Sequence, residues 1–454
     1  MSLLEVDDKF EIAWKSAKKL ADDFLDNKHY YVDSGQYQEA EARKDFIDRF
    51  FIALGWDVNH EHQRDPYRQE VKIETTSPKK LSGRADYAFS LAPLFRRVRF
   101  LVEAKRPQQS ILSPDNCFQT IRYGWPQRVP ICVLTDFFSL HILDTRFRPN
   151  INSALSRVIK SWHCSEYSDP KKFAEIYWLL SREAVAQDSI GRFAFLPDEQ
   201  VAARQYNLFP EETREFDDDF LSKLDEWREQ LAVAFKRAEK RLNGEELTEA
   251  VQRTLDRLIF IRFLEDKAIE EQSIILRFGQ GNKTFWQDFQ AASRRLDQIY
   301  NGTVFKVHPI IDGNTFRPDT LVFSEICDEL TDAHSPYNFD SIPVEILGRI
   351  YERFLGKVVL ARNEKISIVE KEDVRKAGGV YYTPDYIVTY MVENSLGRLI
   401  AGKTPNEILG LRIIDTCLRL RIIFDRCFCL FDASATCNLS GESAAQPCSR
   451  GARR

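Results

Sequence analysis

The chain lacks the features that would place it in a membrane or mark it for export. No apolar run approaches the roughly 20 residues that a membrane-spanning helix needs. The opening segment mixes charged with apolar side chains and has no uninterrupted apolar stretch of the kind found in signal peptides. Internal repeats and low-complexity linkers are also missing. These absences predict a soluble cytoplasmic protein without a membrane partner.

Positive charge is not in excess, because 69 Asp and Glu outnumber 64 Lys and Arg and give a net charge of −5. The chain therefore lacks the overall positive charge that is typical of many nucleic-acid-binding proteins. Multidomain DNA enzymes can nevertheless confine positive charge to one cleft. The length of 454 residues predicts two or three domains rather than one core.

Hydrophobic periodicity predicts a small α/β (α+β) domain over residues 1–190. Residues 39–54 space their apolar side chains as an amphipathic helix that ends at Gly55. A second helix-compatible segment lies around Cys117 to Tyr123. Alternating apolar runs predict four strands, at 84–91, 98–105, 131–135 and 138–143.

From about 191 to 375 the pattern predicts helices. A helix around residues 251–263 has one apolar face, and its other face is rich in arginine. Residues 341–359 predict another helix, capped by Ser341 and with Pro343 in its first turn. These apolar stripes predict packing between helices.

Three residues on two of the predicted strands combine into a chemical site. Residues two apart in a strand face the same way, so Glu103 and Lys105 share one face. The opposite face of that strand is apolar, with Val98, Phe100, Val102 and Ala104. Asp86 reaches the same point if its strand pairs antiparallel with the next one.

Two adjacent carboxylates repel, and a cation that prefers oxygen ligands, such as Mg²⁺, relieves that repulsion. A metal held by Asp86 and Glu103 would bind a phosphate oxygen and lower the pKa of a water, while Lys105 orients that water and steadies negative charge. These parts suffice for phosphodiester hydrolysis. The spacing alone also fits a solvated Glu103–Lys105 pair on an edge strand, because such triples arise often among 69 acidic residues.

The order GRADYAF, FLVEAKRP and QTIRY resembles the PD-(D/E)XK nucleases, in the form fused to bacterial restriction–modification enzymes. The first helix of that family has a glutamate ahead of an arginine and ends in LGW. Here Glu39, Arg43 and the Leu54-Gly55-Trp56 ending match, and Glu41 is the alternative glutamate. The resemblance implies that Glu39 supports a metal or its water.

The family also has a glutamine and a tyrosine four positions apart on the helix after the lysine, and Gln119 and Tyr123 match them. The resemblance implies that these two side chains lie along the backbone of double-stranded DNA. It further implies that Asp86 and Glu103 bind Mg²⁺ and that Lys105 assists the attacking water.

Arginines gather around the same sequence motif. They either contact DNA phosphates or simply keep an arginine-rich loop soluble, and the sequence does not decide between the two. The four are Arg96, Arg97, Arg99 and Arg106.

A second motif, GGVYYTPDYIVTYMVENSLGRLI, spans residues 378–400. Thr383 and Pro384 suit the start of a helix, so a well-capped helix explains the string on its own. The string also resembles the opening motif of gamma-class DNA adenine-N6 methyltransferases, which implies that Tyr382, Thr383 and Pro384 line an S-adenosylmethionine pocket. Residues 408–416 resemble the first Rossmann strand of that family, with Asp415 at its acidic position.

The glycine-rich turn and the N-P-P-Y motif of that family do not follow. Residues 417–454 instead contain five of the nine cysteines and no lysine. We interpret 376–416 as the incomplete, Rossmann-like start of a methyltransferase and 417–454 as a disordered tail that follows a reading-frame shift. S-adenosylmethionine would then serve the complete parent enzyme and not bind here. A zinc site is the competing interpretation, although the cysteine spacing is poor for one.

The middle segments RTLDRLIFIRFLED and IPVEILGRIYERFLG resemble the helical connector of single-chain type IIG and type IIL restriction–modification enzymes. No Walker A loop occurs, which argues against an ATP-driven motor. The sequence therefore predicts the N-terminal part of a type IIG-like enzyme: a Mg²⁺-dependent DNA endonuclease followed by a helical connector at 191–375. The alternatives are an idle DNA-binding or scaffold fragment and a methyltransferase-related protein without nuclease activity.

Overall fold

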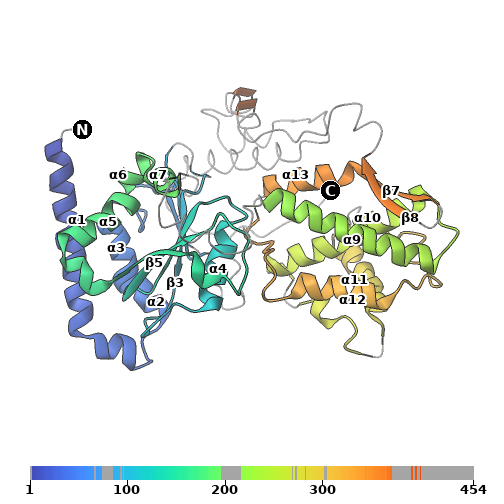
Figure 1. Cartoon of the computed structure of the whole chain (residues 1–454), viewed down its shortest axis with the longest axis horizontal. Coiled ribbons are helices and arrows are strands. Elements are labelled where there is room, and N and C mark those ends of the chain that lie inside the picture. The colour runs from blue at the N-terminus through green and yellow to red at the C-terminus, as the bar shows by residue number, and fades with distance from the viewer. Residues whose placement is uncertain are drawn as a thin grey trace, which may run out of the picture. The chain divides into compact units, whose positions relative to one another are not determined.

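The computed structural model describes residues 3–65, 68–73, 85–92, 95, 97–195, 216–267, 269–270, 273–281, 283–300, 304–342, 344–362, 365–370, 390–391, 394–395 and 399. Within these ranges an α/β part precedes a mainly helical part, as the colours of Figure 1 show. Each part has its own principal hydrophobic core. No helix of the described ranges is long and apolar enough to cross a membrane.

A six-stranded mixed sheet lies at the centre of the α/β part. Its strands are adjacent in sequence order: β1 (Val71–Ile73), β2 (Tyr87–Phe89), β3 (Phe100–Ala104), β4 (Ile131–Thr135), β5 (Ser139–Asp144) and β6 (Val158–His163). All neighbours pair antiparallel except β3 and β4, which are parallel and are joined through helix α4 (Pro114–Gly124). The four predicted strands are confirmed with small shifts at their ends, whereas β1 and β6 were not predicted.

Helices cover both faces of this sheet. Figure 1 shows α1 (Leu3–Asp26), α3 (Asp48–Ala53) and α5 (Pro170–Leu180) on one side of the strands and α4 on the other. Shorter helices α6 (Arg182–Ala186) and α7 (Ser189–Phe195) follow α5. Strand β3 is consequently buried on both faces and lies inside the sheet.

The predicted alternation along β3 is confirmed. Phe100, Val102 and Ala104 join the core that contains α1, α3 and α5. Leu101 joins a different cluster, with Tyr123 of α4. The side of β3 that carries Glu103 therefore faces α4.

The predicted helix at 39–54 is confirmed as three consecutive segments: α2 (Glu39–Ala42), a π-helical turn (Arg43–Ile47) and α3. Phe46, Phe50 and Phe51 are buried along it. Gly55 follows with φ +89°, a left-handed conformation that suits glycine at the end of a helix.

The helical part contains α9 (Phe216–Ala238), α10 (Gly244–Asp266), α11 (Phe285–Tyr300), α12 (Thr320–Thr331) and α13 (Val344–Leu355). The apolar face of α10 is buried as predicted, with Val251, Leu255 and Leu258 in the core. Its arginines do not all face solvent, however, because Arg257 is completely buried.

The prediction of helix up to residue 375 is wrong near its end. After α13 the chain forms an antiparallel strand pair, β7 (Lys357–Arg362) and β8 (Lys365–Glu370). The alternating Ile366 and Ile368 of β8 favour a strand over a helix. Ser341, predicted to cap α13, donates its hydroxyl to the carbonyl of Asn338, and Pro343, predicted in the first turn, lies outside the described residues.

Candidate active site

Side chains from four elements meet at the carboxyl end of β3. Antiparallel pairing sets Tyr87 of β2 opposite Val102, which brings Asp86 beside the end of β3. The Oδ2 atom of Asp86 accepts a hydrogen bond of 2.7 Å from the backbone N–H of Ala104. The predicted antiparallel approach of Asp86 to Glu103 and Lys105 is thus confirmed.

Asp86 is held in place by the first helical segment. Arg43 Nη1 lies 2.8 Å from Asp86 Oδ1, and each side chain is only 11% exposed. Arg43 Nε also donates to the Tyr87 hydroxyl at 3.2 Å, and that hydroxyl donates to Asp48 Oδ1 at 2.7 Å. The sequence matched Arg43 to a family pattern but gave it no role, and it missed Tyr87 and Asp48.

Lys105 connects β3 to α4. Its Nζ donates to Glu103 Oε1 at 2.6 Å and to Gln119 Oε1 at 3.0 Å. Gln119 Nε2 in turn donates to the Tyr123 hydroxyl at 2.6 Å. Residues four apart on a helix lie on one face, so α4 presents Gln119 and Tyr123 together to the end of β3.

Glu103 is the electrostatic centre of the site. It is 4% exposed, and its Oε2 atom is buried without a hydrogen-bond partner among the described residues. Burial raises the pKa of Glu103 to about 8, nearby Asp86 and Glu39 raise it as well, and Lys105 opposes them. The protein alone therefore disfavours ionisation of this carboxyl beside Asp86, a condition that an added cation relieves.

Of the two candidate glutamates on the first helix, Glu39 is the one coupled to the site. Burial and Asp86 raise its pKa, while Lys105 and Arg43 lower it. Glu41 is exposed, and its Oε2 accepts from the backbone N–H of Gln38 at 2.8 Å as part of a capping box. This arrangement favours the choice of Glu39.

The carboxylates near Lys105 form a minimal donor set. Within the ranges that the structure describes, no three or more His, Cys, Asp or Glu side chains gather as a metal-binding group. Mg²⁺ commonly binds through one or two carboxylates and takes its other ligands from water and substrate phosphate. Asp86 together with the unpartnered Oε2 of Glu103 fits that requirement.

The arginines of the motif divide between the two ends of β3. Arg97 and Arg99 precede Phe100, whereas Arg106 follows Lys105 and approaches the carbonyl of Gly35 at 3.5 Å. At about 3.3 Å per residue, Arg99 and Lys105 are separated by roughly 20 Å along the strand. Only Arg106 of these three adjoins the site in sequence and space. Arg96 lies outside the described residues.

The predicted S-adenosylmethionine residues are not covered by the structure. Tyr382, Thr383, Pro384 and Asp415 all lie outside the described residues, as does the tail 417–454. Their roles stay predictions.

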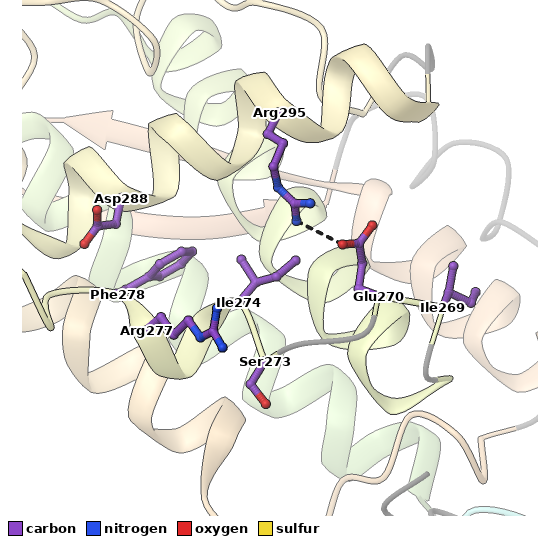
Figure 2. Close-up of a pocket in the computed structure, with 8 residues that line it drawn as sticks. All are labelled: Ile269, Glu270, Ser273, Ile274, Arg277, Phe278, Asp288 and Arg295. Atoms are coloured by element: carbon purple, nitrogen blue, oxygen red, sulfur yellow. Dashed lines mark hydrogen bonds and ion pairs between the residues drawn. The ribbon is translucent and has the colours of Figure 1, made fainter. Parts of the chain in front are cut away.

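A cavity of about 580 Å³ in the helical part is a poorer candidate for chemistry (Figure 2). Figure 2 shows Arg295 reaching toward Glu270, and their Nη2 and Oε2 atoms are 3.0 Å apart. Asp288 Oδ2 accepts from the backbone N–H of Gly279 at 2.9 Å. Its acidic side chains are thus engaged within the fold, and none of the predicted site residues lines it.

No protein-family model and no solved structure matches the chain. Among curated proteins, it is 30% identical over 407 residues to the type II restriction enzyme and methyltransferase RM.Eco57I of Escherichia coli. That match covers 88% of this chain and 38% of the relative. A putative type II restriction enzyme and methyltransferase of Methanocaldococcus jannaschii, RM.MjaORFECS2P, is 26% identical over 195 residues, which are 36% of this chain and 16% of that protein. The chain is thus homologous to the N-terminal portion of a bifunctional type II restriction enzyme and methyltransferase.

Proposed function

We propose that this chain is a Mg²⁺-dependent endonuclease of the PD-(D/E)XK type, the cutting part of a type IIG-like restriction–modification enzyme that acts on double-stranded DNA. The observation that carries the proposal is the buried, unpartnered oxygen of Glu103, with Asp86 and Lys105 beside it. A solvated ion pair on an edge strand does not describe this geometry, because β3 is an interior strand and Glu103 is buried.

Asp86 and Glu103 would hold the cation. When bound, Mg²⁺ would supply positive charge to a phosphate oxygen and favour ionisation of a water molecule. The protein contributes the fixed positions of the two carboxylates: Arg43 and the N–H of Ala104 hold Asp86, and Lys105 holds one oxygen of Glu103.

Lys105 acts in this proposal as a cation rather than as a proton acceptor. Burial alone would lower its pKa, but contact with Glu103 and the charges of Glu39 and Asp86 raise it on balance. A protonated ammonium can orient the attacking water and stabilise negative charge that develops on the phosphate. Gln119 fixes the direction of that ammonium through its Oε1 atom.

The proposal assigns residues 1–190 to the nuclease, 191–375 to a connector and 376–416 to the start of a methyltransferase. Adenine methylation with S-adenosylmethionine would belong to a longer enzyme of this kind. RM.Eco57I, whose name includes both activities, is spanned by this chain over only 38% of its length.

Nicking of supercoiled plasmid DNA tests the proposal. The wild-type chain should nick with Mg²⁺ and not with EDTA. Asp86→Asn should abolish nicking, while Asp26→Asn, a matched change at an exposed position of α1, should leave it intact. Equal rates for these two variants would contradict the assigned site. Complete inactivity of the folded wild type would instead favour an idle DNA-binding fragment.

A further inference from the structure

A second cavity, of about 540 Å³, lies at the end of β3 that is opposite Lys105. Four arginines from three separate segments line it. Arg97 and Arg99 precede β3, Arg128 lies between α4 and β4, and Arg146 follows β5. Such convergence of guanidinium groups does not follow from one arginine-rich stretch of sequence.

The lining of this arginine cavity has an excess of positive charge. Asp188 is the single acidic residue among its described lining residues, against four arginines. Asp188 Oδ1 contacts Arg99 Nη2 at 2.5 Å and is 64% exposed. The cavity therefore carries three more positive than negative side chains, although the whole chain has a net charge of −5.

Two more carboxylates orient the arginines without lining the cavity. Arg128 Nη2 lies 3.1 Å from Asp217 Oδ2. Arg146 places Nε 2.9 Å and Nη2 2.6 Å from the two oxygens of Asp144. Because a guanidinium is planar, such contacts fix its orientation, and ordering before binding lowers the entropy cost of binding an anion.

Arg97 differs from the other three. It is exposed and has no hydrogen-bond or ion-pair partner among the residues whose placement is described. Among the four lining arginines, it is therefore the one that can be replaced without breaking a hydrogen bond or ion pair to another described residue. A ligand with negative charge would give Arg97 a partner that the fold does not supply.

We propose that the arginine cavity binds a phosphate group, at a site separate from the Asp86–Glu103–Lys105 cluster. Guanidinium forks match the oxygens of phosphate, and the cavity volume lies in the range of small-ligand sites. The phosphate belongs either to a DNA strand or to a free anion such as a nucleotide. The DNA source rests on the proposed function, while the free-anion source does not.

Binding measurements in EDTA test this site without involving cleavage or a metal. Inorganic phosphate is titrated by calorimetry, and a labelled DNA duplex is titrated at several salt concentrations. Arg97→Gln is compared with Arg237→Gln, the same change at an exposed position of α9. Thermal unfolding of both variants should match that of the wild type.

We expect Arg97→Gln to weaken binding about three- to tenfold, as loss of one charged contact does, and Arg237→Gln to have no effect. Saturable phosphate binding that Arg97→Gln weakens identifies a free anion as a ligand. If phosphate does not bind but Arg97→Gln weakens duplex binding and reduces the salt slope by about one, the ligand is a DNA strand. Unchanged affinity of Arg97→Gln for both probes overturns the proposal, whether or not the wild type nicks plasmid DNA.

Discussion

Two buried clusters of charged side chains in this chain differ in how completely their polar atoms are paired. In the helical part, Arg257 of α10 is fully buried against Asp312, with both guanidinium–carboxylate distances at 2.9 Å. Arg257 also donates to the carbonyls of Val304 and Lys306, and Asp312 accepts from the N–H of His308. One cation faces one anion, and the remaining polar groups have partners.

The cluster at the end of β3 is paired less completely. Asp86 has Arg43 and Glu103 has Lys105, yet one oxygen of Glu103 is buried without a partner and its pKa is raised to about 8. A buried pair whose polar groups all have partners needs no group from outside the fold, whereas an unsatisfied carboxylate beside a second one marks a place where a ligand completes the charge. We therefore expect a structural role for Arg257–Asp312 and propose a chemical one for Asp86–Glu103–Lys105.

After Asp86→Asn, removal of Lys105 should have the largest effect on activity. Without its ammonium the site loses the donor that we propose stabilises negative charge on the phosphate, so Lys105→Ala should slow nicking on the order of a thousandfold. The unfolding midpoint should fall less than for loss of Arg257, because Glu103, whose pKa burial raises to about 8, can take up a proton when Lys105 is gone. Lys171→Ala, at an exposed position of α5, is the matched control for plasmid nicking. Nicking by Lys105→Ala at the rate of the control would contradict a catalytic role for the cluster at the end of β3.

Removal of Arg257 should act on stability. Arg257→Met leaves Asp312 buried and unpaired, so the free energy of unfolding should fall by about 3–5 kcal/mol. Urea unfolding of the variant and of Arg257→Met/Asp312→Leu measures this effect, and the double variant should recover much of the loss. A loss no larger than that of exposed Arg237→Met would show that the buried pair is not structural.

The titration of Glu103 should make the stability of the metal-free protein depend on pH. Its pKa is about 8 in the folded chain and 4.5 for a solvated glutamate, so the folded chain keeps this proton to higher pH. The stability that protonated Glu103 contributes is full below about pH 4.5 and is lost as pH rises through about 8. Metal-free wild type should lose up to about 1.4 kcal/mol per pH unit over that window.

Urea unfolding in EDTA between pH 5 and 9 checks this pH dependence. Glu103→Gln carries a neutral amide in the same place, so its stability should fall less over this window than that of the wild type. Parallel stability profiles for the two proteins would show that Glu103 does not titrate in the manner that its burial indicates.

Loss of Gln119 should have the smallest effect. Lys105 keeps its contact with Glu103 when Gln119 is changed to Ala but loses the contact that joins it to α4. We expect nicking to slow about tenfold, because one hydrogen bond to a charged group is lost. The effect should appear in kcat more than in KM. Gln280→Ala, at an exposed position ahead of α11, is a control that should leave the rate unchanged.

Local patterns in the sequence predicted the parts of the site that depend on periodicity. Two-residue alternation placed Glu103 and Val102 on opposite faces of β3. The family resemblance, with its spacing of four, paired Gln119 with Tyr123 on one helix face. Partners distant in sequence were not predictable in this way. Arg43 and Asp86 are 43 positions apart, and Arg257 and Asp312 are 55 apart, so neither contact leaves a periodic signal.

Short elements were the main failures. Strand β1 has three residues, too few for an alternation to stand out, and the β7–β8 pair follows directly on a strongly amphipathic helix. Residue type misled once as well. The sequence put the arginines of α10 on the face opposite its apolar stripe, and because arginine is rarely buried, only the distant Asp312 shows that Arg257 is buried.

Titration with Mn²⁺, followed by electron paramagnetic resonance, tests the central claim most directly, because it requires neither cleavage nor a target sequence. Mn²⁺ prefers the same oxygen ligands as Mg²⁺. The account predicts that the wild-type chain binds Mn²⁺ at a site that both Asp86→Asn and Glu103→Gln weaken at least tenfold, whereas Asp26→Asn does not. Equal Mn²⁺ binding by the wild type and all three variants would contradict it.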